Sequence, residues 1–140
     1  MDKFLGVPYP ITIDASGLLH VQHGVDQIKS DLLVLLLTNP GERVMLPDYG
    51  TDLRKLIFEP NDAILQQKAV NIIAQSIRTW EPRVVIDQIS VTSKVDKDDI
   101  NPLDDLTNQE NILKIIINFF DPENIQSVEE LRLEMPLAGT

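Results

Sequence analysis

The sequence has no cysteine, so disulfide bonds, thiolate metal sites and cysteine nucleophiles are all excluded. Its longest apolar run, residues 32–37, is far shorter than the roughly 20 residues that a helix needs to cross a bilayer. Residues 1–4 lack the basic start and the long apolar stretch of a secretion signal. We therefore expect neither a membrane span nor a secretion signal.

Basic side chains are also few. The 140 residues carry 12 basic and 22 acidic side chains, which gives a formal net charge of −10. Binding to nucleic acid or to an anionic membrane surface needs clustered Lys and Arg, so we expect neither as a partner. Aromatic residues make up only 5% of the chain, which leaves few side chains to stack on sugar rings. A chain of this length is expected to form one domain with one core.

Helical periodicity is confined to the first half of the sequence. Residues 24–39 and 61–80 repeat apolar side chains at helical spacing, and each segment ends close to a proline. Asn61 or Asp62 is expected to cap the second helix. A shorter helix is predicted for residues 52–58. The first helix is apolar on nearly all sides, so we expect it to pack against partners.

The second half of the sequence alternates in the manner of β-strands. Strands are predicted over residues 84–95, 111–120 and 128–135, and apolar and charged residues alternate cleanly in the last of them. Helices followed by an antiparallel meander predict an α+β fold, with two main helices packed on a three-stranded sheet.

The remaining segments are expected to be less regular. Residues 1–23 contain two prolines and are predicted to form an extended arm, with a small hairpin around the turn at residues 14–17. Residues 24–140 are predicted to form a single α+β domain, in which residues 96–110 make an acidic loop between two strands.

Two features of the sequence resemble metal sites, but each lacks ligands that such a site needs. His20 and His23 are the only histidines, and no convincing third ligand stands near them. The run that begins at Asp96 resembles a calcium loop, but Asn101 stands at the glycine position and Thr107 at the closing glutamate position. We expect no metal and no cofactor.

Glu59 and Glu81 are the candidate residues for acid–base chemistry. Each follows an aromatic residue and precedes a proline at the end of an element. Glycoside hydrolysis uses two carboxyl groups about 5 to 9.5 Å apart. The simpler interpretation is that both end a helix and pair with Arg43, Arg54 or Arg83. We therefore expect no catalytic residue, and a peptidoglycan-degrading, lysozyme-like hydrolase that uses Glu59 and Glu81 is the alternative.

Three segments, taken in order, carry a family resemblance. They are NPGERVMLPDYG at residues 39–50, LIFEP at residues 56–60 and WEPRV at residues 80–84. Together they resemble the gene-25-like baseplate wedge family, which includes the W protein of contractile phages and the TssE component of type VI secretion. The resemblance covers about residues 26–93, so the arm and the acidic loop lie outside it.

The resemblance implies a structural subunit of the baseplate, at the point where a contractile sheath begins, in six copies per particle. It implies a fold similar to the interlocking, handshake-like domain of the sheath subunit. The implied partners are the baseplate wedge proteins and the first ring of sheath subunits, with tube or hub proteins as further candidates. The implied location is a virion tail baseplate or injection-particle baseplate, assembled in the host cytoplasm. Whether that machine is a phage tail, a tailocin, an injection particle or a secretion system stays open.

The signature of this family falls on Glu81, Pro82 and Arg83, which the resemblance implies to contact the helical core bundle of the wedge proteins. The residues themselves leave a second option open, because Arg83 is equally suited to an internal ion pair with a nearby carboxylate.

The predicted meander has two edge strands, and an unprotected edge accepts a strand from another chain. We expect the sheet to bind extended arms of the first sheath ring, so that the chain nucleates sheath polymerisation by β-augmentation. The residues expected to contact the sheath strand lie on the last strand: Val128, Glu130, Arg132 and Glu134.

Overall fold

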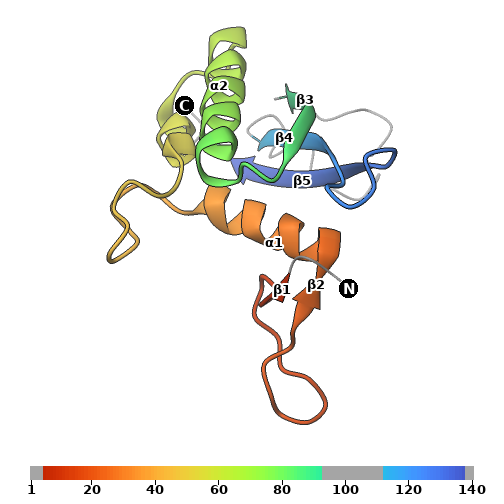
Figure 1. Cartoon of the computed structure of the whole chain (residues 1–140). Helices are drawn as coiled ribbons and strands as arrows, with labels where there is room; N and C mark the ends of the chain where they lie inside the picture. Colours follow the sequence, from red (N-terminus) through yellow and green to blue (C-terminus); the bar gives the residue numbers. More distant parts are fainter. Residues whose placement is uncertain (1–4, 93–111, 138–140) are drawn as a thin grey trace, which may run out of the picture.

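The computed structural model describes residues 5–92 and 112–137. Two long helices pack on a three-stranded antiparallel sheet, and a two-stranded hairpin projects from the start of the first helix (Figure 1). The predicted α+β fold is therefore confirmed. The elements are β1 (Leu5–Gly6), β2 (Gln22–His23), α1 (Gly24–Leu37), the 3-10 helix η1 (Asp52–Phe58), α2 (Ala63–Trp80), β3 (Val85–Thr92), β4 (Ile112–Phe120) and β5 (Val128–Pro136).

The sheet has the predicted meander topology, in the order β3-β4-β5, with both pairs antiparallel. Ile117 in the central strand pairs with Ile89 on one side and Leu131 on the other. One face of β4 is completely buried, because its alternate side chains meet the helices. These side chains are Leu113, Ile115, Ile117 and Phe119.

Helix α2 follows its sequence signals closely. The side chain of Asp62 accepts a hydrogen bond of 2.8 Å from the backbone N–H of Leu65, which identifies Asp62 as the N-cap. The helix ends at Trp80, as predicted, because Pro82 cannot continue it. Its buried face consists of Leu65, Ala69, Ile73 and Ile77.

Helix α1 is covered by its own chain more fully than its composition suggests. It contacts α2, η1, β1, β2 and β5, so elements from both halves of the chain surround it. Val34 is its exposed large apolar residue, at 37% of its surface, while Leu33 packs partly buried against the core. The expectation that this helix needs outside partners is therefore wrong for most of its surface.

The arm folds back on itself. β1 pairs with β2 through Leu5–His23 and Gly6–Gln22, and a single bridge joins Ile13 to Leu19 nearer the tip, so the predicted small hairpin is present. The predicted acidic loop at residues 96–110, with its calcium-like run, lies outside the described residues, as does the end of the strand predicted over residues 84–95. No helix in the described ranges is long and apolar enough to span a membrane.

Candidate partner-binding sites

The chain makes a sharp corner between α2 and β3. The backbone N–H of Glu81 donates to Ile77 O at 2.8 Å, and the N–H of Val84 donates to Glu81 O at 3.1 Å. Val84 is buried by this turn, while Pro82 and Arg83 are exposed on the outside of the corner. Residues 81–83 therefore form a tightly folded corner whose outer side chains are exposed.

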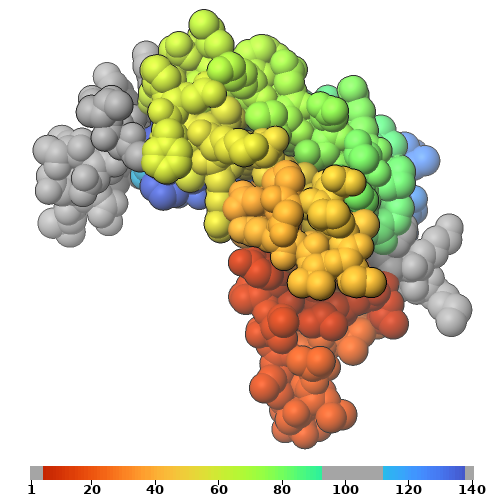
Figure 2. Space-filling view, turned by 90° about the vertical axis from the view of Figure 1, so that its left-hand side faces the viewer, coloured from red at the N-terminus to blue at the C-terminus, as the bar shows by residue number. Residues whose placement is uncertain are grey.

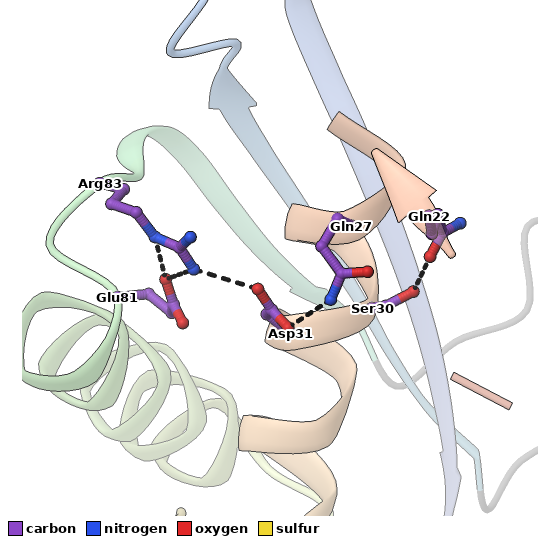
Figure 3. A network of polar contacts seen from close by, with 6 residues as sticks. All are labelled: Gln22, Gln27, Ser30, Asp31, Glu81 and Arg83. Atoms are coloured by element: carbon purple, nitrogen blue, oxygen red, sulfur yellow. Dashed lines mark hydrogen bonds and ion pairs between the residues drawn. The ribbon is translucent and has the colours of Figure 1, made fainter. Parts of the chain in front are cut away.

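The side chain of Arg83 holds this corner together (Figure 3). Its Nε and Nη2 atoms donate to Glu81 Oε2 at 3.0 and 2.6 Å, and Nη2 also donates to Asp31 Oδ2 at 3.0 Å. Partial burial lowers the pKa of Arg83, but the hydrogen bonds that it donates to the Glu81 and Asp31 carboxylates, together with their charges, outweigh this effect, so its pKa is raised. The internal ion pair that the sequence left open is therefore present, with Asp31 of α1 as a second acceptor.

Two further polar contacts lie on α1, one beside the corner and one at the arm (Figure 3). Asp31 Oδ1 accepts a hydrogen bond of 2.8 Å from Gln27 Nε2, and Ser30 Oγ donates to Gln22 Oε1 at 2.8 Å. Gly6 lies directly over Gln27, because a Cβ on Gly6 would stand 2.5 Å from Gln27 Nε2. The base of the arm is thus attached to the same face of α1 that binds Arg83.

An aromatic contact joins the loop at residues 39–50 to the end of α2. The rings of Tyr49 and Trp80 meet edge-on, with centroids 5.3 Å apart, and the Arg43 guanidinium lies 4.6 Å from the centroid of Tyr49. Partial burial raises the pKa of Tyr49, the Arg43 charge opposes that shift, and Glu81 and Asp31 add to it. The loop therefore rests against the corner.

Gly50 lets this loop close onto the end of α1. Its φ is +123°, and a Cβ there would stand 2.4 Å from Thr38 O, so no other residue fits without a shift of the backbone. The next residue, Thr51, donates its N–H to Thr38 O at 2.8 Å and its hydroxyl to Leu36 O at 2.9 Å. The loop tip stays exposed, with Val44 and Met45 almost fully accessible.

The two candidate catalytic carboxylates are each bound to a cation. Glu81 pairs with Arg83, one of the predicted arginines, whereas Glu59 Oε2 binds Lys68 Nζ at 2.6 Å. The prediction of an arginine partner is thus wrong for Glu59, because α2 places Lys68 directly beside it. Among the described residues, a cavity of about 330 Å³ lies between the loop and α2 and another of about 390 Å³ lies beside η1, and neither is lined by Glu59 or Glu81.

In the part of the chain that the structure describes, the outer strands of the sheet are open on one side. Within the described ranges, β3 and β5 each pair only with β4. Val128, Glu130, Arg132 and Glu134 are all exposed on β5, and Arg132 forms an ion pair with Glu130. Lys29 Nζ binds Glu129 Oε2 at 2.7 Å, which ties the start of β5 to α1.

Metal-ligating residues do not gather in the part of the chain that the structure describes. No group of three or more His, Asp or Glu side chains there is arranged to hold a metal ion. His20 lies exposed in the arm, and His23 is the residue before α1.

The sequence did not indicate that Asp31 and Tyr49 belong to the corner, and Arg43, a predicted partner of the carboxylates, lies over the ring of Tyr49. The one available signal for Asp31 was an acidic residue within the otherwise apolar second half of α1. Its partner, Arg83, is 52 residues away, and no local pattern encodes such a contact.

Comparison with known proteins agrees with this geometry. The family of the baseplate wedge protein gp25 matches residues 22–119 of the chain. The baseplate wedge protein gp25 of Enterobacteria phage T4 is 29% identical over 112 residues, which cover 80% of this chain and 75% of that protein.

Solved structures show the same fold. A Geobacter sulfurreducens protein provisionally designated a tail lysozyme is similar with a TM-score of 0.63 at 20% identity, over 81% of this chain and 90% of that one. A chain in the anti-feeding prophage baseplate is similar with a TM-score of 0.61 at 21% identity, over 98% of this chain and 87% of that one. The family match spans the loop, the corner and most of the sheet, so the chain belongs to the baseplate wedge protein gp25 family.

Proposed function

We propose that this baseplate component is a non-enzymatic subunit that anchors in the wedge through its Glu81–Arg83 corner and nucleates the sheath at the edge of its sheet. The observation that carries the proposal is the open edge of β5. Nine residues of this strand pair with β4 on one side, and among the described residues no strand pairs on the other.

Backbone pairing along β5 is the source of affinity in this proposal, because an added strand completes the unpaired N–H and C=O groups. The alternating exposed side chains on β5 define the register of the added strand and oppose stray association. In a ring of six subunits, modest contacts gain from high effective concentration. The partner strands are the extended arms of the first sheath ring.

The corner supports the proposed anchor because it is rigid before binding. Glu81 and Asp31 hold the Arg83 guanidinium, so its outer surface and Pro82 are presented in one geometry. A preorganised surface loses less conformational entropy when it binds. The proposed partner is the helical core bundle of the wedge proteins.

A structural role also agrees with the surroundings of the two carboxylates. A glycosidase needs two carboxyl groups that face one substrate cleft. Glu59 and Glu81 instead bind Lys68 and Arg83, and neither lines either of the cavities described above. The purified chain is expected to release no soluble fragments from peptidoglycan, and release that disappears in Glu59→Gln and Glu81→Gln would overturn the non-enzymatic role.

The sheath contact is tested with a photo-crosslinking residue at Val128 of β5 or at Val85 of β3. Both are half-exposed valines at the beginning of an outer strand, so each controls for the other. In assembled particles Val128 is expected to crosslink to a sheath subunit. Crosslinks to sheath from Val85 alone, or from neither position, would contradict the assignment to β5.

Proline substitutions test the same strand by function. Arg132→Pro with Glu134→Pro is expected to block sheath growth while baseplates still form, because proline removes backbone donors from the strand. Circular dichroism reports whether the variant folds, and Arg132→Glu provides a milder second variant. Sheaths of normal length on baseplates that contain folded variant would count against nucleation at β5.

The wedge anchor is tested with Arg83→Ala against Lys68→Ala. Each variant removes the cation of a partly exposed ion pair, but Lys68 lies away from the corner. Arg83→Ala is expected to remain folded and to enter baseplates poorly, while Lys68→Ala enters normally. Equal incorporation of both variants would remove the anchoring role of Arg83.

A further inference from the structure

The arm between Leu5 and Gln22 exposes an unusual concentration of apolar side chains. It stands clear of the domain as a narrow column at the bottom of the space-filling view (Figure 2). Most of its large apolar residues are exposed to solvent over two-fifths or more of their surface. They are Leu5, Val7, Tyr9, Ile11, Ile13, Leu18, Leu19 and Val21.

The arm is held in shape at both ends. At its base, β1 pairs with β2, and Gln22 accepts a hydrogen bond from Ser30 of α1. At its tip, the Asp14 carboxylate accepts hydrogen bonds from the N–H groups of Ser16 and Leu18, at 2.8 and 3.0 Å. An exposed apolar hairpin with this much internal support is suited to docking, because little order has to be gained on binding.

The charge of the arm restricts the choice of partner. Residues 5–22 contain no Lys or Arg, and their single charge, Asp14, is engaged in the turn at the tip. The chain as a whole carries −10, so an anionic membrane would repel it. A second copy carries the same net charge of −10, so bringing two copies together is opposed by repulsion between like charges.

We propose that the arm inserts into an uncharged, apolar groove on a different protein of the baseplate. The family match begins at residue 22, so nearly all of the arm lies outside the part of the chain that the family model describes. At the base of the arm, Gln22 accepts a hydrogen bond from Ser30 of α1, and one turn of the same helix holds Gln27 and Asp31, which bond each other beside the corner.

The test compares Ile11→Asp in the arm with Ile64→Asp at the start of α2, in the full-length chain. The two isoleucines are 68% and 65% exposed, so each change adds one charge at a similarly accessible apolar position. Loss of one buried apolar side chain from an interface weakens binding by about tenfold or more. Incorporation of Ile11→Asp into particles is expected to fall by about that factor, with Ile64→Asp unaffected.

A photo-crosslinker at Ile13 identifies the occupant in assembled particles. The expected product joins this chain to one other baseplate protein, and Leu18 serves as a second position if the bridge between Ile13 and Leu19 is disturbed. Crosslinks to a second copy alone, or cosedimentation of the wild-type chain with anionic lipid vesicles that Ile11→Asp abolishes, would overturn the proposal. So would normal incorporation of Ile11→Asp with no crosslink from either position. The sheath contact at β5 is scored separately through Val128, so either result stands without the other.

Discussion

Arg83 binds Asp31 across 52 residues of sequence, with its Nη2 atom 3.0 Å from Asp31 Oδ2. The contact joins the exit of α2 to the middle of α1. It fixes the position of the corner relative to the first helix.

The Arg83–Asp31 contact is expected to contribute modestly to stability. Both side chains are about one-third exposed, and pairs of this kind contribute about 0.2 to 1 kcal/mol. A double-mutant cycle with Arg83→Ala and Asp31→Asn, measured by urea unfolding, should give a coupling energy in that range. A coupling of zero would show that the contact positions the corner without stabilising the fold.

Gly50→Ala is expected to be strongly destabilising. The new Cβ would meet Thr38 O at 2.4 Å, at a φ of +123°, so strain and overpacking together should cost about 3 kcal/mol or more. Gly17→Ala is the matched control, because its φ is +82° but nothing lies within 4 Å of its Cβ position. Chemical denaturation should give a much lower free energy of unfolding for Gly50→Ala than for Gly17→Ala. Equal losses of unfolding free energy would mean that the backbone around Thr38 moves to accommodate the new Cβ.

Tyr49 is expected to make the fold sensitive to alkaline pH. Burial raises its pKa in the folded chain above the value of 10.0 that applies to the unfolded chain. The contribution of Tyr49 to the free energy of unfolding is fully present below pH 10. It is lost as the pH rises through the folded pKa, because the unfolded chain releases the proton first. Tyr49→Phe keeps the ring against Trp80 and should show a smaller fall in unfolding free energy above pH 10. An identical alkaline fall in both proteins would exclude Tyr49 as its source.

The tip of the arm is expected to loosen in acid or on mutation of Asp14. Hydrogen bonds from Ser16 and Leu18 lower the pKa of Asp14, so the turn is fully supported above pH 3.8 and loses support as the pH falls through the folded pKa. Asp14→Ala should speed amide hydrogen exchange at Ser16 and Leu18 at neutral pH, with global stability unchanged. Asp14→Asn keeps an acceptor oxygen, so its exchange rates at Ser16 and Leu18 should lie between those of the wild-type chain and those of Asp14→Ala.

The elements and their order could be predicted from the sequence because each depends on neighbours within a few residues. Asp62 caps α2 through a contact three residues away, and the alternation in β4 assigns Leu113 and Ile115 to the buried face without knowledge of what covers them. The resemblance to the gp25 family likewise depended on short segments at fixed spacing, and the family match confirms it.

Only the tertiary structure decided which of these segments meet. Helix α1 is apolar on most sides, and the sequence could not show that the chain itself would surround it. Nor could it show that Glu59 pairs with Lys68, or that Arg83 reaches Asp31. Ion pairs and aromatic contacts between distant segments depend on where whole elements pack, and that packing is set by the summed burial of the core, which no single motif records.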